Sequence, residues 1–268
     1  MKEDIRKAMR IVTINTWKGD GQYARRLKLM TDGLQQVRPD IVCLQEALRS
    51  SDHTYDTATI LADALDMDHV YGPSRYKPRE IAGKTVQCHS GLAILSVYPI
   101  HRSWVDTLVE HPDDPDRIGL SAQLMSGDDL IMLTNLHLTH IVGQDEHRFK
   151  QLKTVIAQNS DAARGSHWFC CGDLNFEFDP TQPTMNLNGE DVEPIDCYRA
   201  GGGTLPGGTL SLVTKVSKQR RIDYILYLKR SPGSLPDFKD ATRVLTRADQ
   251  DGCYASDHFG VAVDTLLP

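Results

Sequence analysis

Six short segments of the chain place polar side chains at or just beyond the end of an apolar run. A carboxylate beside an amide or a histidine can bind a cation and move a proton, and hydrolytic chemistry needs both. Each segment alone is typical of a turn, a cap or a solvated strand end. Together they predict a metal-dependent hydrolase. The segments are Asn15, Gln45-Glu46, Asn135 with His137, Asp173 with Asn175, Asp223, and Asp257-His258.

The acidic side chains of this set favour a hard cation. Carboxylates such as Glu46 suit Mg²⁺ or Mn²⁺, which bind one or two carboxylates together with waters and phosphate oxygens. Zinc is disfavoured, because the sequence has neither an HExxH motif nor a Cys/His cluster. A structural Ca²⁺ is disfavoured because no EF-hand loop is present. The expected substrate is a phosphate ester, whose charge a divalent cation and imidazolium groups would neutralise.

Asn15 and Gln45-Glu46 each follow a predicted strand, and a predicted helix connects the two strands. Residues 10–15 form a short β-branched run, and residues 24–37 carry apolar side chains at helical spacing. Residues 41–44 form a second apolar run that leads into Gln45-Glu46. Because both strand ends of a β-α-β unit lie at one edge of the sheet, we expect Asn15 and Glu46 at equivalent positions.

The rest of the chain is predicted to be rich in strands, with helices over 55–65 and 145–156. Ser126–Asp129 and Tyr98-Pro99 predict hairpin turns. The glycines of 201–208 predict a loop that either shapes a substrate site or is a plain connection. The strand-and-helix pattern runs twice in degraded form, so we expect two mixed β-sheets packed face to face, with helices outside. The expected strands cover 91–95, 118–124, 130–138, 167–171, 222–228 and 259–263.

The composition favours a globular enzyme over a general nucleic-acid coat. The chain has 268 residues, 40% of them hydrophobic, and no low-complexity linker, so we expect one domain. A formal net charge of −6 weakens sequence-independent binding to nucleic acid, which depends on Lys and Arg. Basic residues gather in 75–84 and 215–221. These stretches are either solvated loops or contacts for an anionic substrate.

The sequence carries no recognisable export or membrane signal. Residues 1–8 are charged and lack an apolar core, and no run of about 18 apolar residues occurs. The six cysteines form no CxxC pair, and three lie in apolar, strand-like contexts where Cys acts as a small hydrophobe. We therefore expect a cytoplasmic protein with reduced thiols and no transmembrane segment. No protein partner is implied.

Taken in order, the six segments resemble the endonuclease/exonuclease/phosphatase superfamily of DNase I-like hydrolases. The resemblance runs from Asn15 to His258. It implies an α/β fold, specifically a four-layer α/β/β/α sandwich of two mixed β-sheets, in a bacterial-type single-domain member. Residues 10–268 would form the catalytic domain, and residues 1–9 an N-terminal extension. Four motifs are specific as a set: Gln45-Glu46, Gly172-Asp173-Leu174-Asn175, Arg221-Ile222-Asp223-Tyr224 and Ser256-Asp257-His258.

The resemblance also implies metal and water ligands. Glu46 matches the principal metal ligand of the family, with Asn15 and Asp257 close to the metal, and Mg²⁺ is expected, with Mn²⁺ as an alternative. Asp173 matches the residue that orients or deprotonates the attacking water. Asn175 matches its neighbour that holds a phosphate oxygen.

Two histidines complete the implied catalytic set. His137 resembles the histidine that stabilises the pentacovalent transition state. His258 resembles the terminal histidine paired with a carboxylate, for which Asp223 is the matching candidate. Arg148 begins a predicted helix and either reaches a phosphate or pairs with Asp145. The expected substrate contacts are Asn135, Arg75 and Arg148.

The expected activity is Mg²⁺-dependent hydrolysis of a phosphate ester, more a phosphodiester than a monoester, by in-line attack of water activated by Asp173. Nucleic acid, a phospholipid headgroup and a small metabolite remain open as substrates. The alternatives are a phosphomonoesterase, a sphingomyelinase-like lipid phosphodiesterase and a non-catalytic binding module. A binding module would show replacement of Glu46, Asp173 or His258, and none is replaced. The sequence shows no apolar hairpin for docking to a membrane.

Overall fold

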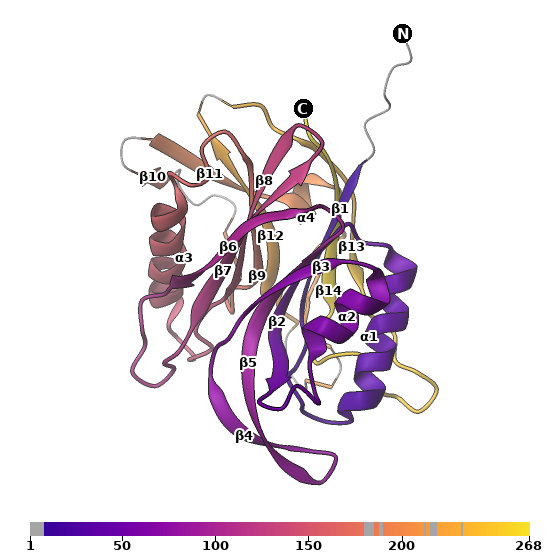
Figure 1. Ribbon diagram of the computed structural model, residues 1–268. Helices are drawn as coiled ribbons and strands as arrows, with labels where there is room; N and C mark the ends of the chain where they lie inside the picture. The colour runs from indigo at the N-terminus through magenta and orange to yellow at the C-terminus, as the bar shows by residue number, and fades with distance from the viewer. Residues whose placement is uncertain (1–7, 180–184, 188–189, 212, 215–218, 232) are drawn as a thin grey trace.

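Two seven-stranded β-sheets, packed face to face, form the centre of the protein (Figure 1). The computed structural model describes residues 8–179, 185–187, 190–211, 213–214, 219–231 and 233–268. The first sheet has the strand order β13-β14-β1-β2-β5-β3, with β4 paired to β5. Its strands are β1 (Met9–Asn15), β2 (Ile41–Ser50), β3 (Asp68–Gly72), β4 (Tyr76–Ile81), β5 (Lys84–Ser96), β13 (Asp237–Val244) and β14 (Gly260–Leu266).

The second sheet has the strand order β10-β11-β12-β9-β8-β7-β6. Both sheets are mixed, since β1 runs parallel to β2 and β8 runs parallel to β9, while the other pairs are antiparallel. The strands of this sheet are β6 (Ile100–Thr107), β7 (Ile118–Ser126), β8 (Asp129–His137), β9 (His167–Asp173), β10 (Met185–Leu187), β11 (Glu190–Asp196) and β12 (Asp223–Arg230).

Helices cover the outer faces of the two sheets. α1 (Tyr23–Val37) and α2 (Thr57–Leu65) pack on the first sheet, and α3 (Asp145–Asn159) packs on the second (Figure 1). A short helix, α4 (Cys197–Ala200), follows β11. One cluster of buried apolar side chains fills the space between the sheets, and one lies beneath the helices on each outer side. This is the predicted four-layer α/β/β/α sandwich.

Local sequence explains where the helices lie. In α1 the buried side chains include Leu27, Met30 and Leu34, which recur at the spacing of one helical face. Asp56 caps the N-terminus of α2, since its carboxylate accepts a hydrogen bond from Thr59 N. The predicted helices over 24–37, 55–65 and 145–156 therefore match α1, α2 and α3 to within a few residues.

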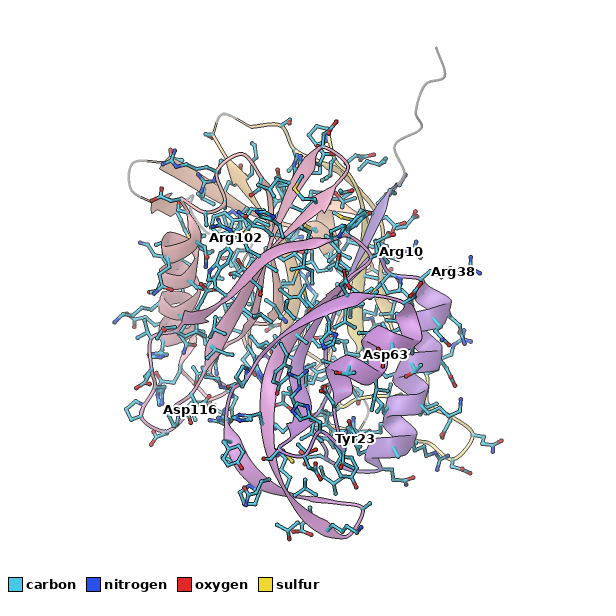
Figure 2. All side chains as sticks on the ribbon, viewed as in Figure 1. Arg10, Tyr23, Arg38, Asp63, Arg102 and Asp116 are labelled. Atoms are coloured by element: carbon cyan, nitrogen blue, oxygen red, sulfur yellow. The ribbon has the colours of Figure 1, made fainter. Side chains whose placement is uncertain are left out.

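Arg10 fixes the start of β1 against two neighbouring elements. Its Nε donates to Asp264 on β14 at 2.6 Å, and its Nη1 donates to Val37 O at the end of α1 at 2.8 Å. Figure 2 shows Arg10 beside the C-terminal end of α1, near Arg38. The central strand of the first sheet is thus tied to a neighbouring strand and to the helix layer.

The parallel pairs bring the predicted polar segments to one edge of the molecule. β1 and β2 are joined by α1, and β8 and β9 are joined by α3, so each sheet contains one parallel pair with a helical connection. Asn15, His137 and Asp173 are the last residues of β1, β8 and β9, and Glu46 lies within β2, one residue beyond the partner of Asn15. β12 is antiparallel to β9, so its amino end, with Asp223, lies at the same edge.

Two local predictions differ from the structure. Ser126–Asp129 forms the predicted hairpin, between β7 and β8. The hairpin predicted at Tyr98-Pro99 is wrong, because the chain passes there from β5 in the first sheet to β6 in the second. The stretch 75–84 is a hairpin arm and not a loop, since Tyr76–Ile81 pairs with Lys84–His89. Its strands carry too many charged side chains to show an apolar alternation.

The remaining expectations have a mixed outcome. All six cysteines are free, and five of them are buried. Within the described residues, no helix is long and apolar enough to cross a membrane. Lys215 and Lys218 of the second basic stretch lie outside the described residues. The domain boundary near residue 9 stays a prediction.

Candidate active site

Asp173 is the centre of the polar cluster at this edge. It is only 1% exposed, at the end of β9, and the strand register places His137 on one side of it and Asp223 on the other. Its Oδ2 accepts a hydrogen bond from Asn15 Nδ2 at 3.0 Å, and its Oδ1 accepts one from Asn175 N at 2.9 Å. The carboxylate is therefore held at both oxygens.

A glycine allows β9 to deliver Asp173 at this position. Gly172 has φ +136°, and a Cβ built on it would lie 2.0 Å from the backbone oxygen of Leu136 on β8. Only glycine tolerates both the backbone conformation and this close approach. The residue before Asp173 is thus set by the geometry of the parallel pair β8–β9.

Replacing Gly172 with alanine is expected to destabilise the protein by about 3 kcal/mol, because strain and a backbone clash coincide there. Urea unfolding of Gly172→Ala beside Gly165→Ala would measure this. Gly165 also has a positive φ, but a Cβ added to it would meet no atom within 4 Å, so its alanine variant should lose only about 1 kcal/mol. Equal losses in the two variants would contradict the close-approach argument.

Burial and a neighbouring acid change the acidity of Asp173. Desolvation, together with repulsion from Asp223, raises the pKa of Asp173 to about 7, although the His258 cation and the hydrogen bond from Asn15 oppose the rise. A carboxylate of this pKa exchanges its proton near neutral pH. It is therefore suited to act as a general base.

His258 has the opposite character. Its Nδ1 lies 2.9 Å from Asp223 Oδ2, and its Nε2 lies 3.9 Å from Asp173 Oδ2. Burial lowers the pKa of His258, but the attraction of Asp223 and Asp173 outweighs burial and raises it to about 10. The ring is consequently an imidazolium at neutral pH, and it directs positive charge toward Asp173.

His137 is buried beside the same carboxylate, with Nε2 3.5 Å from Asp173 Oδ2. Burial, followed by repulsion from Arg117 and Lys18, holds the pKa of His137 well below its ordinary value. The ring is therefore neutral at neutral pH in this structure. The sequence led us to expect two imidazolium groups, and only His258 fits that description.

Glu46 lies across from these groups, in a bulge of β2. The register with β5 shifts between Leu44 and Ala47, and Glu46 has φ +55°. The bulge turns its carboxylate toward Lys18, whose Nζ lies 2.8 Å from Glu46 Oε1. Bulges often redirect a side chain beside an active site.

A second carboxylate lies near Glu46. Burial raises the pKa of Asp257, and repulsion from Glu46 adds to the rise, although His258 opposes it. Ser256 fixes the local chain by donating from Oγ to Asn15 O at 2.6 Å. Glu46, which pairs with the Lys18 ammonium group, and Asp257 thus provide carboxylate oxygens that attract cations.

Asn135 and Gln45 join the two sheets instead of lining the site. Asn135 is fully buried, and its Nδ2 donates to Leu44 O and Ala93 O, both at 2.9 Å. Its Oδ1 accepts from Gln45 Nε2 at 2.7 Å. Since both amide hydrogens of Asn135 are used, we propose a structural role for it in place of the expected substrate contact.

Arg148 forms an ion pair with Asp145, which is one of the two alternatives that the sequence leaves open. Its guanidinium also donates from Nε to Thr139 O at 2.7 Å and from Nη2 to Ile141 O. The side chain therefore fixes the loop that follows β8. We propose that Arg148 positions this loop and does not contact the substrate.

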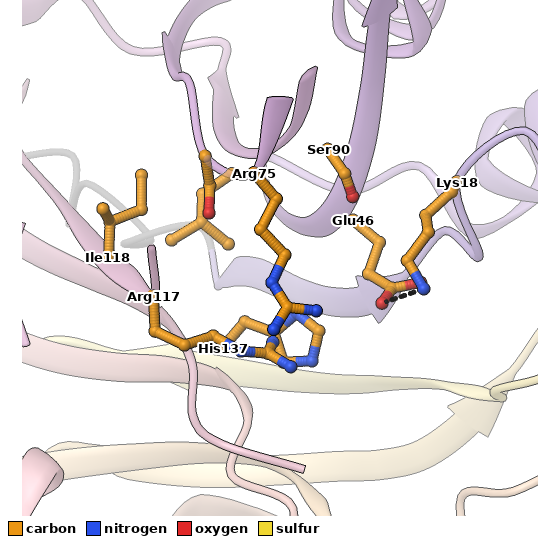
Figure 3. A pocket seen from close by; sticks show the side chains of 9 residues that line it. Lys18, Glu46, Arg75, Ser90, Arg117, Ile118 and His137 are labelled. Carbon is orange, nitrogen blue, oxygen red and sulfur yellow. Dashed lines mark ion pairs between the residues drawn. The ribbon is translucent and has the colours of Figure 1, made fainter. Parts of the chain in front are cut away.

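Arg75 does line the site. Lys18, Glu46, Arg75, Arg117 and His137 surround a cavity of about 20 Å³ (Figure 3). Figure 3 shows the two guanidinium groups beside the His137 ring, with the Lys18–Glu46 pair opposite. The cavity is lined by three cationic side chains and one carboxylate.

Sequence reasoning missed three residues that shape this region. Lys18 follows Asn15 by three residues, and Arg117 stands just before β7. Thr209 fixes the start of β12, since its Oγ1 accepts from Ile222 N at 3.1 Å and from Asp223 N at 3.3 Å. The ends of apolar runs were the main signal, and these residues do not lie there. A basic residue at the beginning of the 118–124 run was a signal that could have found Arg117.

A protein-family model described as the endonuclease/exonuclease/phosphatase family matches residues 12–258. The chain belongs to this family. Members of the endonuclease/exonuclease/phosphatase family are generally phosphoesterases or nucleases, and the chain has their fold. The six polar segments all lie within the matched residues.

Solved structures share this family fold. Zebrafish TDP2 humanized by 14 mutations aligns with a TM-score of 0.74 at 18% identity, covering 97% of this chain and 99% of that one. Zebrafish TDP2 complexed with a single strand DNA product aligns with a TM-score of 0.73 at 17% identity, covering 97% of this chain and 100% of that one. The human Nocturnin catalytic domain with bound sulfate anion aligns with a TM-score of 0.69 at 20% identity, covering 99% of this chain and 96% of that one. No curated protein matches the chain in sequence.

Proposed function

We propose that this chain is a Mg²⁺-dependent phosphoesterase that hydrolyses a phosphodiester. The observation that carries the proposal is the pairing of a buried carboxylate of raised pKa, Asp173, with a buried imidazolium, His258, which lies 3.9 Å away. The oxygen ligands Glu46 and Asp257 lie beside this pair. A general base, a cationic hydrogen-bond donor and a site for a cation are the parts that phosphate-ester hydrolysis requires.

Glu46 and Asp257 would hold the metal ion, with Asn15 close by. Their fit rests on the attraction of this corner for positive charge, as the ammonium of Lys18 at 2.8 Å from Glu46 indicates. When bound, Mg²⁺ supplies neutralisation of charge on the phosphate oxygens. Mn²⁺ prefers the same oxygen ligands.

Asp173, Asp223 and His258 also have ligand atoms within 4.8 Å of one another. We assign this group to catalysis and not to metal binding. His258 Nδ1 is occupied by its hydrogen bond with Asp223, which favours a positioned proton donor over a metal ligand. In this proposal the three side chains transfer protons and stabilise charge.

Each catalytic residue has a stated task in this proposal. Asp173 accepts a proton from the attacking water, and His258 donates to an oxygen that becomes more negative in the transition state. His137, as a neutral ring, donates a hydrogen bond to a second oxygen. Asn175 gives one amide hydrogen to Leu138 O at 3.1 Å and keeps the other for a phosphate oxygen.

A nucleic-acid or nucleotide diester is the substrate we favour. Two similar structures support an anionic ligand, since TDP2 was solved with a single strand DNA product and Nocturnin with a sulfate anion. Arginines at the cavity suit the same chemistry. The alternative substrates are a phosphomonoester and a phospholipid headgroup, and the alternative to an enzyme is a non-catalytic binding module. We also propose that the protein is cytoplasmic.

Removing divalent metal is expected to reduce hydrolysis of bis-p-nitrophenyl phosphate to background, because the phosphate charge would then lack its main counterion. EDTA treatment followed by Mg²⁺ readdition would measure this, with Mg²⁺-saturated EDTA as the control. Mn²⁺ should also restore turnover. Hydrolysis that persists in excess EDTA would contradict the assignment of Glu46 and Asp257.

The same assay tests the ester preference. Faster turnover of bis-p-nitrophenyl phosphate than of p-nitrophenyl phosphate would support the diesterase, and the reverse order would support a phosphatase. Lack of turnover with both esters, and with an oligonucleotide and a sphingomyelin panel, would favour the binding module.

A further inference from the structure

Asp114 is the centre of a second buried cluster, next to the proposed catalytic site. It is 0% exposed and accepts hydrogen bonds from Thr139 Oγ1 at 2.8 Å and from His140 N at 3.0 Å. Arg117 Nε donates to it at 3.0 Å, and Arg75 Nη2 donates to it as well. One carboxylate therefore orients two guanidinium groups.

The two arginines come from different parts of the fold. Arg75 precedes β4, at the base of the hairpin arm of the first sheet, whereas Arg117 precedes β7 of the second sheet. Both line the cavity that His137 and Glu46 also line (Figure 3). The cluster thus presents its charge directly beside the catalytic groups.

The two guanidinium groups keep unused hydrogen-bond donors, although Glu46 attracts both of them, Asp116 attracts Arg75 and Asp173 attracts Arg117. Two guanidinium groups share the single carboxylate of Asp114, and within the described residues no hydrogen-bond partner is present for Nη1 of either arginine. The side chain of Arg117 is 7% exposed and that of Arg75 is 17% exposed. Buried guanidinium donors without a hydrogen-bond partner are costly unless a ligand accepts from them.

We propose that Arg75 and Arg117 form a subsite for a second phosphate group of the substrate, adjacent to the phosphate hydrolysed at Asp173. The inference rests on the proposed phosphoesterase function. Guanidinium groups bind phosphate oxygens through paired, charge-assisted hydrogen bonds, and Asp114 holds both groups in place before the ligand arrives. The substrate class is a phosphoester that carries another phosphate within a few bonds. A nucleotide and a small bisphosphorylated metabolite share this chemistry.

The test compares two probes that differ only in the second phosphate. Thymidine 5′-(p-nitrophenyl phosphate) is measured with and without a 3′-phosphate, and the same pair is built on glycerol. The wild type is expected to hydrolyse the bisphosphate with a kcat/KM about 10- to 100-fold higher, the range for charged hydrogen bonds. A larger ratio for thymidine than for glycerol would identify nucleotides as the source. Equal ratios would identify the phosphate alone as the determinant.

Arg75→Gln and Arg117→Gln are expected to bring this kcat/KM ratio close to one. The ratio is independent of the fraction of folded enzyme, so partial misfolding does not mimic the effect. Arg75→Gln is the safer variant, because Arg75 is the more exposed of the two. Lys77→Gln is the matched control, since Lys77 lies exposed on the same hairpin and does not line the cavity. A wild-type ratio near one, or an unchanged ratio in both arginine variants, would overturn the subsite.

A binding measurement separates this subsite from the proposed activity. Calorimetric titration of pyrophosphate into the protein in EDTA reports anion binding without turnover. Binding that weakens at least tenfold in Arg75→Gln, but not in Lys77→Gln, would support the subsite even if neither probe were hydrolysed and the phosphoesterase proposal failed. Absence of pyrophosphate binding to the wild type would refute the subsite, whatever the activity.

Discussion

Replacing Asp173 with asparagine is expected to lower kcat for phosphodiester hydrolysis by about 10²- to 10⁴-fold, the usual contribution of a general base. Asparagine has the same shape but only one acceptor oxygen, so it can accept the hydrogen bond from Asn15 Nδ2 or from Asn175 N but not both. Asp161→Asn is the matched control, because Asp161 is an exposed surface residue paired with Arg164. Turnover of Asp173→Asn within threefold of wild type would exclude Asp173 as the base.

The pH dependence tests the same assignment. The base must be ionised to accept a proton, so log kcat of the wild type should rise with pH and level off above the pKa of Asp173. That pKa is about 7 in the protein alone, and a bound divalent cation lowers it by stabilising the carboxylate. The rise should therefore occur at or below neutral pH. The residual rate of Asp173→Asn should lack this rise.

The second large effect is expected for His258→Gln, with a loss of about 10²- to 10³-fold in kcat, as for removal of a donor that stabilises transition-state charge. Gln keeps a neutral donor but removes the positive charge that Asp223 and Asp173 maintain on the ring. His101→Gln is the matched control, since His101 is exposed on β6. A loss below threefold would exclude a catalytic role for His258.

The two variants are coupled through charge. Because the His258 cation lowers the pKa of Asp173, His258→Gln should move the rise in log kcat to higher pH. A folding defect alone would reduce the amplitude of the profile without moving it. A shifted profile thus separates loss of the imidazolium from loss of structure.

Most elements of the fold were predictable from local pattern, and each failure has a physical cause. The helices and the strands with apolar runs lie close to their expected residues. The arm of β4 and β5 was missed because its pairing is carried by the backbone of charged residues such as Lys77 and Arg79. The turn at Tyr98-Pro99 was misread because a turn sequence fixes a change of direction but not the partner of the next strand.

The candidate site residues show the same contrast between local sequence signals and tertiary contacts. Asn15, Glu46, Asp173 and His258 could be found from the sequence because each follows an apolar run or belongs to a distinctive motif. Arg117 only precedes an apolar run, and its position beside the cavity depends on the contact with Asp114.

The sequence by itself determined the fold class and the family, because apolar periodicity and ordered motifs are properties of the chain read in one dimension. Only the tertiary structure decided that Asn135 joins the sheets and that His137 is neutral where His258 is charged. The physical reason is that hydrogen-bond partners and charge depend on groups distant in sequence. Burial and the nearest charges set a pKa, and both arise only when the two sheets pack together.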